Sequence, residues 1–387
     1  MNDPTLLDYY VQRKMDPVPL NLETPEAFRR HREKRGNLYD RHLGIPFGLL
    51  EGRDVIEFGC NSGENALVLA EAGARVTLVE PNVAAHARLR DLFDRFGLSE
   101  RLVAVVAADM AGFRTDRTYD LAIAEGFLNT LSNRDAMLGR MLALLKPRGL
   151  AVVSFDDRTG GMIEMMKRAI HWQACRLAGI DDVFAAPSLS LAGRLFGDDF
   201  AKLNASRPFS AWWEDQLVNP FALSLWSFED ILKVIEPLGG RFRTASPVWT
   251  LRDRMAWYKD VPPPQTWRES LREEWLAALP FFLTGRPLSR PDLREEAATI
   301  VGDIADLIAA IARFSGGYPP RGDLPEIPGP LAAYLDALVP GLGMEMRGIG
   351  VHDGALESLV ARYHASPILR DIWGSLYHYL CFENAGA

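Results

Sequence analysis

Cysteine is scarce in this chain, and its few thiols are placed where neither a metal site nor a disulfide framework is expected. The 387 residues include three cysteines, Cys60, Cys175 and Cys381, and no two of them share a CxxC spacing. An odd, widely spaced set is typical of reduced thiols. We therefore expect no zinc site, no structural disulfide and a cytoplasmic location.

The chain also lacks an excess of positive charge and long apolar runs. Asp and Glu outnumber Lys and Arg by 51 to 43, and the resulting net charge of −8 argues against nucleic acid or an anionic membrane as a partner. No uncharged apolar stretch reaches the roughly 18 residues of a membrane span, and no basic region leads into an apolar run at the N-terminus. We expect neither a membrane span nor a secretion signal.

Apolar residues are abundant, at 48%, and between residues 54 and 155 they follow an alternating rhythm. Short apolar runs predict strands, and longer stretches of helical spacing separate them. The predicted strands are residues 54–58, 75–79, 102–107, 119–124 and 149–155, and the predicted helices are 66–72, 84–96 and 134–145. This alternation favours a parallel sheet with helices on both faces.

After this segment the rhythm stops and returns only briefly. Residues 157–226 are rich in Met, Arg, Phe and Trp, with helical spacing at 162–178, and we interpret them as an inserted helical lid. A capping box at Ser227 predicts a helix to Leu238. Strands are predicted at 242–251 and 255–258, where the sheet is expected to end, and the proline-rich segment 261–264 is expected to be a linker. Further helices are predicted at 267–283, 290–314, 330–338 and 354–380.

These patterns divide the chain into four parts. They are an N-terminal helical cap at 1–52, an α/β domain at 53–156 plus 227–260, the insertion at 157–226 and a C-terminal helical region at 261–387. In the last part an apolar stripe needs a cover, and we favour a homodimer for that reason. The stripe consists of Ile300, Ile304, Leu307, Ile308 and Ile311.

The sharpest local signal is a strand, a glycine-containing turn and a helix between residues 55 and 72. Gly59 and Gly63 follow a G-x-x-x-G spacing, with Asn61 between them and Glu57 in the strand. Such a turn brings bare backbone close to a ligand. A carboxylate beside it would repel a pyrophosphate, whereas it suits a cationic ligand.

Two more acids follow strand ends. Glu80 comes 21 positions after Gly59, where an acid can accept both hydroxyls of a ribose, and Asp109 follows the third predicted strand. Open α/β sheets bind ligands at the carboxyl ends of their strands. Three acids on adjacent strand ends therefore predict a ring of carboxylates in that crevice.

In this order the motifs resemble those of class I S-adenosylmethionine-dependent methyltransferases, over residues 38–156 and 227–258. The segment from Glu57 to Gly63 resembles the family's glycine motif, Glu80 its ribose-binding acid and Asp109-Met110 its adenine-binding pair. Residues 119–126 resemble the fourth strand, and 144–149 resemble the turn before the fifth. Asn61 and Arg148 stand where the family mostly has glycine, and Asn is the other residue that best tolerates positive φ.

The resemblance implies a Rossmann-like, mostly parallel seven-stranded sheet. It also implies S-adenosylmethionine as the cofactor, with S-adenosylhomocysteine as the product. Methyl transfer needs alignment, exclusion of water and, for a hydroxyl acceptor, removal of a proton, so no metal is expected. The implied cofactor-binding residues are Glu57, Gly59, Cys60, Asn61, Gly63, Glu80, Pro81, Asp109, Met110, Glu125 and Gly126.

The segments expected to bind the methyl acceptor carry no motif that we recognise. Candidates for acid–base chemistry are His171, Asp156 and Asp157, and candidates for substrate contact are Trp212, Trp213 and Arg158. The plainer interpretations are a packed or solvated histidine for His171 and core packing for the tryptophans. The basic run from Arg29 to Arg35 is interpreted as a solvated helix face, with contact to an anionic substrate group as the alternative.

The sequence thus predicts methyl transfer to an O or N atom of a small molecule, such as a sugar or a natural-product intermediate. The acidic balance disfavours a nucleic-acid acceptor, and no signature favours a protein acceptor. Two alternatives stay open. One is a cofactor-binding assembly or regulatory protein that no longer turns over, and the other is a nicotinamide-dependent dehydrogenase.

Overall fold

The chain forms two compact units, and each is described by itself. The computed structural model describes residues 6–13, 22, 24–203, 205, 207–250, 264–287, 292–351 and 353–386. The first unit combines residues 1–155, 226–249 and 378–387, and the second combines 156–225 and 250–377. The strand predicted at 255–258 and most of the proline-rich linker lie outside the described residues.

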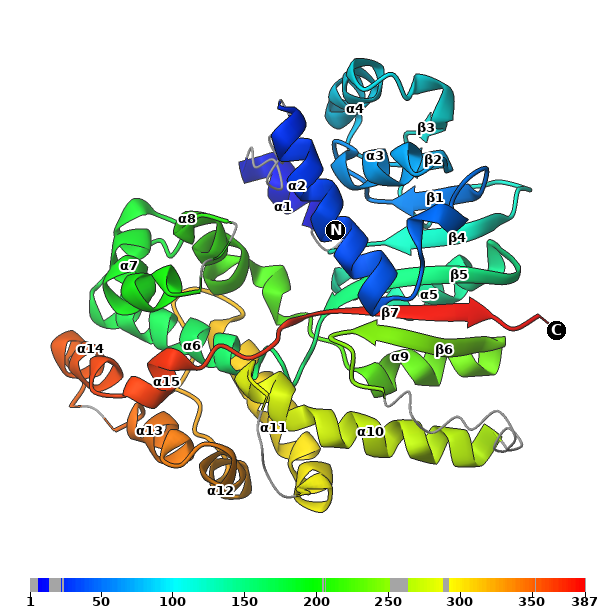
Figure 1. Cartoon of the computed structure of the whole chain (residues 1–387). Coiled ribbons are helices and arrows are strands. Elements are labelled where there is room, and N and C mark those ends of the chain that lie inside the picture. Colours follow the sequence, from blue (N-terminus) through cyan, green and yellow to red (C-terminus); the bar gives the residue numbers. More distant parts are fainter. Residues whose placement is uncertain are drawn as a thin grey trace. The chain divides into compact units, whose positions relative to one another are not determined.

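One seven-stranded sheet forms the centre of the first unit, and its strand order is β3-β2-β1-β4-β5-β7-β6 (Figure 1). The strands are β1 (Asp54–Phe58), β2 (Arg75–Val79), β3 (Leu102–Val106), β4 (Tyr119–Ala124), β5 (Leu145–Asp156), β6 (Gly240–Ser246) and β7 (Tyr377–Asn384). Neighbouring strands from β3 to β5 are parallel, and β7 is antiparallel to β6. The predicted Rossmann-like, mostly parallel sheet is confirmed.

The course of the chain through the sheet determines where the helices lie. The helices of this unit are α1 (Leu6–Arg13), α2 (Pro25–Gly36), α3 (Glu64–Glu71), α4 (Val83–Arg95), α5 (Arg134–Ala143) and α9 (Phe228–Ile235). From β1 the chain moves outward to β2 and β3, and then it returns to β4 and continues to β5 on the other side. Because parallel crossovers are right-handed, α3 and α4 cover one face and α5 the other. Consistently, α2 packs on α3, α3 on α4, and α5 on α9.

This reversal of direction between β1 and β4 positions the site. At such a switch point the loops after the two strands diverge, and a crevice opens at their carboxyl ends. The strands beneath it are fully buried, since Val55, Ile56, Ala122 and Ile123 have no exposed surface. Glu57 at the end of β1, Glu80 after β2 and Glu125 after β4 therefore stand on a rigid support.

The last strand is the main departure from the sequence prediction. A helix was predicted through residue 380, but the structure ends its helices at α14 (Leu356–His364) and α15 (Pro367–Asp371) and then forms β7 between β5 and β6. Leu380, Cys381 and Phe382 are at most 2% exposed. A short apolar run does not separate helix from strand by its period, whereas the aromatic residues around it favour a strand.

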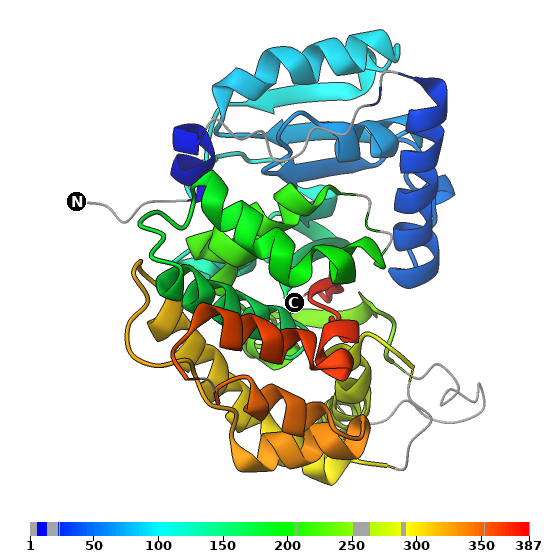
Figure 2. The same cartoon turned by 90° about the vertical axis from the view of Figure 1, so that its left-hand side faces the viewer.

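The second unit is helical. It contains α6 (Met162–Leu177), α7 (Ala186–Ala201), α8 (Phe209–Trp212), α10 (Pro264–Thr284), α11 (Arg294–Ser315), α12 (Gly329–Leu338), α13 (Leu342–Gly348), α14 and α15. Helix α11 packs against α6, α10 and α12, and α14 packs against α6 and α7 (Figure 2). The sequence analysis assigned the insertion and the C-terminal region to different parts, whereas the structure packs their helices together.

The apolar stripe on α11 is covered within this unit. Its five residues, Ile300, Ile304, Leu307, Ile308 and Ile311, are at most 6% exposed. The reason given for a homodimer, an uncovered stripe, is therefore absent, although dimerisation itself stays a prediction. Among the helices that the structure describes, none has the length and hydropathy needed to cross a bilayer.

Candidate functional site

The loop between β1 and α3 takes the bent course that its glycines predict. Gly59, Asn61 and Gly63 have positive φ angles of 65°, 47° and 84°. A Cβ on Gly59 would lie 2.8 Å from the ring of Phe127, so this position accepts only glycine. Cys60 is 7% exposed, and burial raises the pKa of its thiol, so the thiol is not activated as a nucleophile.

The two residues that replace family glycines adopt the backbone conformation that glycine would provide. Asn61 and Arg148 are the non-glycine residues with positive φ in the described part of the chain, at 47° and 64°. Both turns therefore keep the geometry that the motif requires, at the small strain of a non-glycine side chain in this region.

Glu80 connects two loops at the carboxyl edge of the sheet. Its Oε2 accepts a hydrogen bond of 2.7 Å from the N–H of Asn61, and its Oε1 accepts one of 2.8 Å from the N–H of Asn82. The side chain is 5% exposed. A carboxylate oxygen has two lone pairs, so each oxygen keeps one for another donor. The two hydroxyls of a ribose match that remaining capacity.

The other predicted cofactor residues lie in the loops after β2, β3 and β4. Pro81 follows Glu80 and is partly exposed, Asp109 is exposed, and Met110 is buried at 5%. Gly126 is exposed, and its N–H donates to Ser154 Oγ of β5 at 2.9 Å. These residues share the carboxyl edge of the sheet with Glu80.

A buried ion pair at the end of β4 was missed by the sequence analysis. Arg35 of α2 donates from Nη1 to Glu125 Oε2 at 2.8 Å, and each side chain is 8% exposed. Tyr379 of β7 donates to the same oxygen at 3.1 Å, and Tyr39 donates to Oε1 at 3.4 Å. Burial disfavours the charged guanidinium, but Glu125 outweighs it, so the pKa of Arg35 lies above its usual value.

The interpretation of the basic run as a solvated helix face is therefore wrong at its last member. Arg29 and Arg30 have 65% of their side chains exposed, whereas Arg35 is 6% exposed. His31, Arg35 and Tyr39 are spaced four residues apart, which places them on one face of the helix and its π-helical extension, Asn37–His42. That spacing, with an aromatic residue at one end, is the sequence feature that could have indicated a buried helix face.

Glu57 is the most unusual group of this site. It is 4% exposed, and its Oε2 has no hydrogen-bond partner among the described residues. Burial and then the charge of Glu125 raise the pKa of Glu57 to about 8, although Arg35 acts in the opposite direction. The crevice therefore holds more carboxyl groups than cations, and it fits a ligand that carries positive charge.

Comparison with known protein families agrees with this geometry. The model of a family described as a methyltransferase domain matches residues 28–197. Residues 28–197 are therefore similar to a methyltransferase domain. The match extends from α2, which contributes Arg35, through all of β1 to β5, and it confirms the resemblance found in the motifs.

The individual proteins that resemble this chain share only part of its length or few identical residues. The cypemycin N-terminal methyltransferase of Streptomyces sp. is 32% identical over 121 residues, which are 29% of this chain and 47% of that protein. The CcbJ methyltransferase structure from Streptomyces caelestis has 23% identity over 33% of this chain and 57% of its own, with a TM-score of 0.28. The [4+2]-cyclase SpnF has 15% identity over 97% of this chain and 86% of its own, with a TM-score of 0.38. TM-scores this low do not establish a shared overall fold.

Among the acceptor candidates, Asp156 has the most perturbed carboxyl group. It is the last residue of β5 and is partly exposed. Burial, followed by the charges of Glu164 and Asp215, raises its pKa to about 7. Asp157 is 1% exposed, and its Oδ1 accepts from the Gly160 N–H at 2.7 Å, so it shapes the turn before α6.

The remaining acceptor candidates are distributed over the helical unit. His171 has no exposed surface, and its Nε2 lies 2.9 Å from Ser188 Oγ. Trp212 and Trp213 are 8% and 6% exposed, and Trp212 Nε1 donates to Glu164 at 2.7 Å. Arg158 is partly exposed. The plainer interpretations of a packed histidine and core tryptophans describe these positions.

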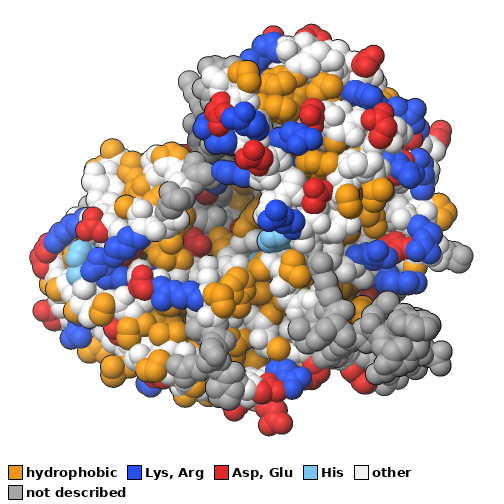
Figure 3. All heavy atoms as spheres, in the orientation of Figure 1, with side chains coloured by type: hydrophobic (Ala, Val, Ile, Leu, Met, Phe, Trp, Pro, Cys, Tyr) orange, Lys and Arg blue, Asp and Glu red, His pale blue; other side chains and the backbone are white. Residues whose placement is uncertain are grey.

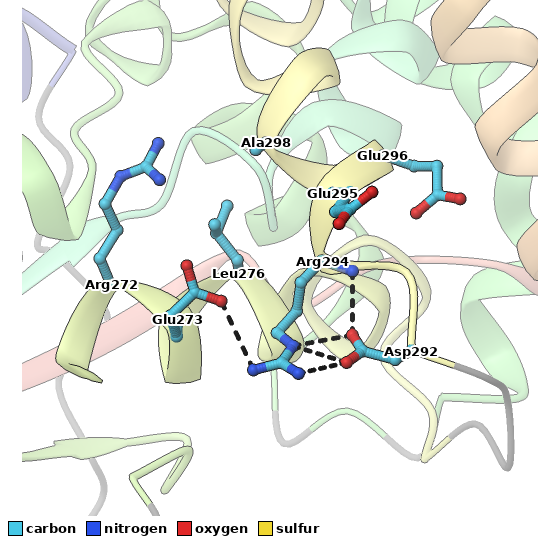
Figure 4. Close-up of a pocket in the computed structure, with 8 residues that line it drawn as sticks. All are labelled: Arg272, Glu273, Leu276, Asp292, Arg294, Glu295, Glu296 and Ala298. Atoms are coloured by element: carbon cyan, nitrogen blue, oxygen red, sulfur yellow. Dashed lines mark hydrogen bonds and ion pairs between the residues drawn. The ribbon is translucent and has the colours of Figure 1, made fainter. Parts of the chain in front are cut away.

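The surface offers no stronger candidate in the parts that the structure describes. A hollow between α10 and α11 is lined by exposed ion pairs, among them Arg294 with Asp292 and with Glu273 at 3.4 Å, and it contains no predicted site residue (Figure 4). On the face in Figure 3, basic and acidic side chains are intermixed. We therefore take the carboxyl ends of β1, β2 and β4 as the candidate active site.

Proposed function

We propose that this chain is an S-adenosylmethionine-dependent methyltransferase that methylates an O or N atom of a small molecule by in-line displacement. The supporting observation is the crevice between β1 and β4, where Glu57, Glu80 and Glu125 surround a glycine turn inside the matched domain. A dinucleotide would bring a pyrophosphate against these carboxyl groups. S-adenosylmethionine brings a sulfonium and an ammonium group instead, which favours it over a nicotinamide cofactor.

The chain's own residues would bind and orient this cofactor. S-adenosylmethionine, when bound, supplies a methyl group on a positively charged sulfur. Glu80 has lone pairs left for the ribose hydroxyls, Asp109 and Met110 suit the adenine end, and Glu125 with Gly126 suits the amino-acid end. The orphaned Oε2 of Glu57 fits a ligand that carries positive charge.

Asp156 is the proposed proton acceptor. A base works best when its pKa lies near the working pH, and the pKa of Asp156 is about 7. It would remove a proton from a hydroxyl, or from an ammonium group that must become neutral before it attacks. Amines are the first acceptors to test, because the relative with 32% identity is named an N-terminal methyltransferase.

The test is binding followed by turnover with the full-length protein. We expect S-adenosylmethionine to raise the melting temperature and NADH to leave it unchanged. Labelled methyl groups should then pass to members of a panel of small amines and alcohols. Stabilisation by NADH alone would instead indicate a dehydrogenase. Tight cofactor binding without transfer to the panel or to a crude metabolite extract would favour the cofactor-binding assembly protein.

A further inference from the structure

Glu57 is buried in the first unit without a full set of hydrogen bonds. Its side chain is 4% exposed, and Oε2 has no partner within the described part of the chain. An ionised carboxylate in such a position would lack compensation for the water it has lost. The group is therefore stable only when it is protonated or when it lies opposite a cation.

The cation already present is committed to another acid. Arg35 donates to Glu125, which also accepts from Tyr39, Tyr379 and, at 3.4 Å, Asn65 Nδ2. The other titratable groups that interact with Glu57 are Glu64 of α3, Glu80 after β2, Cys60 of the glycine turn and Tyr39 after α2. The nearest further cations by element are His31, on the same helix as Arg35, and Arg88 of α4, which pairs with Glu64.

None of these other groups supplies a free positive charge to Glu57. Arg88 lies 3.3 Å from Glu64, with which it pairs. Burial, and then the charge of Arg35, lower the pKa of His31 to about 4, so its ring is neutral at pH 7. With the pKa of Glu57 at about 8, its carboxyl group is protonated at neutral pH in the ligand-free protein.

We propose that the carboxyl group of Glu57 gives its proton to solvent when a cationic ligand enters the crevice. The protonated acid and the free cation become a carboxylate–cation pair and one released proton, so charge and atoms balance. This inference rests on the proposed function, because S-adenosylmethionine is the cation considered. It makes Glu57 a group that favours charged ligands over neutral analogues.

A definite pH dependence follows. Below pH 8 every bound ligand must first displace a proton, so affinity should rise about tenfold per pH unit as long as the bound state is ionised. Above pH 8 affinity should be constant. A site with no linked proton would instead show flat affinity from pH 6 to 8.

Calorimetry of the full-length protein in two buffers of different ionisation enthalpy, phosphate and imidazole, measures the proton count directly. At pH 6.5 we expect about one proton released per S-adenosylmethionine bound. S-adenosylhomocysteine keeps the ammonium group but has no sulfonium. Release with both ligands identifies the ammonium as the partner of Glu57, and release with S-adenosylmethionine alone identifies the sulfonium. No net release with either ligand would overturn the inference.

Two variants make the assignment specific. Glu57→Gln keeps the shape but cannot ionise, so it should bind without proton release, and its affinity should not change between pH 6 and 8. Glu71→Gln, on α3 and paired with Arg32 on the surface, is the matched control and should release as many protons as wild type. Equal release from Glu57→Gln would contradict the proposal. If it fails to fold, the wild-type proton count still decides.

The outcome also separates this inference from the proposed function. Binding without proton release overturns the role of Glu57 and leaves the methyltransferase assignment intact. Absence of S-adenosylmethionine binding at every pH would overturn both.

Discussion

Buried charge is handled differently in the two units. In the helical unit, Arg168 has no exposed surface, yet it donates to Ser315 Oγ at 3.0 Å and to the carbonyls of Gln216 and Asn219 at 3.2 and 2.9 Å. In the sheet unit, Glu57 is nearly as buried, and one of its oxygens has no partner among the residues that the structure describes. A buried charge with several hydrogen bonds, such as Arg168, is suited to holding elements of the fold together. A buried carboxyl oxygen without a partner among the described residues, such as Oε2 of Glu57, is typical of a group that binds a ligand.

Other buried charges of the helical unit follow the first pattern. Asp199, at 2% exposed, accepts from Arg370 and, at 3.1 Å, from Tyr363. Lys167 donates to the Ile372 carbonyl at 3.0 Å and lies 3.3 Å from the centre of the Trp373 ring. These contacts join α6 and α7 to segments that lie 164 to 205 residues further along the chain. These buried side chains therefore hold the helical unit together, whereas Glu57 of the sheet unit is proposed to bind a ligand.

The largest expected effect comes from removing the cation that pairs with Glu125 in the candidate site. Arg35→Met would leave Glu125 buried opposite no positive charge, and we expect a loss of about 3–5 kcal/mol in the free energy of unfolding. Cofactor affinity should fall as well, because Glu125 loses its orientation. Urea unfolding and calorimetry measure the two effects.

A surface pair on the same helix provides the control. Arg32 bonds to Glu71 at 2.7 Å with 45% of its side chain exposed, so Arg32→Ala should change stability by less than about 1 kcal/mol. The double variant Arg35→Met with Glu125→Gln should regain much of the lost stability. If Arg35→Met were no more harmful than Arg32→Ala, the buried pair would have no special role.

The next effect concerns the proposed base of the helical unit. Asp156→Asn should lower the rate of methyl transfer about 100-fold, within the usual range for a lost general base. In wild type the rate should rise with pH and level off above about pH 7, where the carboxylate is ionised. Rates across pH 5–9 test this, with the exposed Asp181→Asn as the control.

The same carboxyl group should affect stability with a defined sign. The pKa of Asp156 is raised from 3.8 to about 7 on folding, so the folded state holds the proton more tightly. Its contribution to stability is complete at low pH and is lost as pH rises through 7. Asp156→Asn should flatten that part of the stability profile. An unchanged profile would contradict the assigned pKa.

Removing a loop-connecting acid should have a smaller effect. Glu80→Ala should weaken S-adenosylmethionine binding by about 1–3 kcal/mol, since it removes an acceptor from the ribose hydroxyls and from the N–H groups of Asn61 and Asn82. Glu71→Ala on the neighbouring helix is the control. Wild-type affinity in Glu80→Ala, measured by calorimetry, would remove Glu80 from the cofactor site.

The sequence predicts the parts of the fold that depend on local pattern. Strands β1 to β5 alternate with helices at short range, so this part of the sheet could be predicted, and Glu57, Glu80 and Asp109 at the ends of β1 to β3 indicated a candidate binding edge. Asn61 and Arg148 could be assigned to tight turns for the same reason, because backbone conformation is a local property.

Long-range contacts could not be predicted from the sequence. Tyr379 reaches Glu125 across 254 positions, and Arg35 reaches it across 90. The spacing of His31, Arg35 and Tyr39 marks a buried helix face, but no local pattern identifies Glu125 as the partner of Arg35 or of Tyr379. For the same reason the sequence analysis divided the helices of the second unit, which are joined by contacts such as that of Arg168 with Ser315.

The smallest expected effect is on a residue that was a catalytic candidate. His171 has no exposed surface, and burial together with Arg168 lowers its pKa to about 3, so the ring stays neutral. His171→Leu should therefore leave kcat and KM within twofold of wild type. It should lower stability by about 1 kcal/mol, through loss of the bond to Ser188 Oγ.

The pH dependence of stability sharpens this test. A histidine with a depressed pKa in the folded state destabilises the protein as pH falls below 6.5, because the unfolded chain takes up the proton more readily. His171→Leu should remove that part of the acid sensitivity, which urea midpoints between pH 4 and 7 would reveal. A tenfold fall in kcat in a folded His171→Leu variant would show that this histidine takes part in the reaction. The contrast between Glu57 and the structural buried groups of the helical unit would then no longer hold.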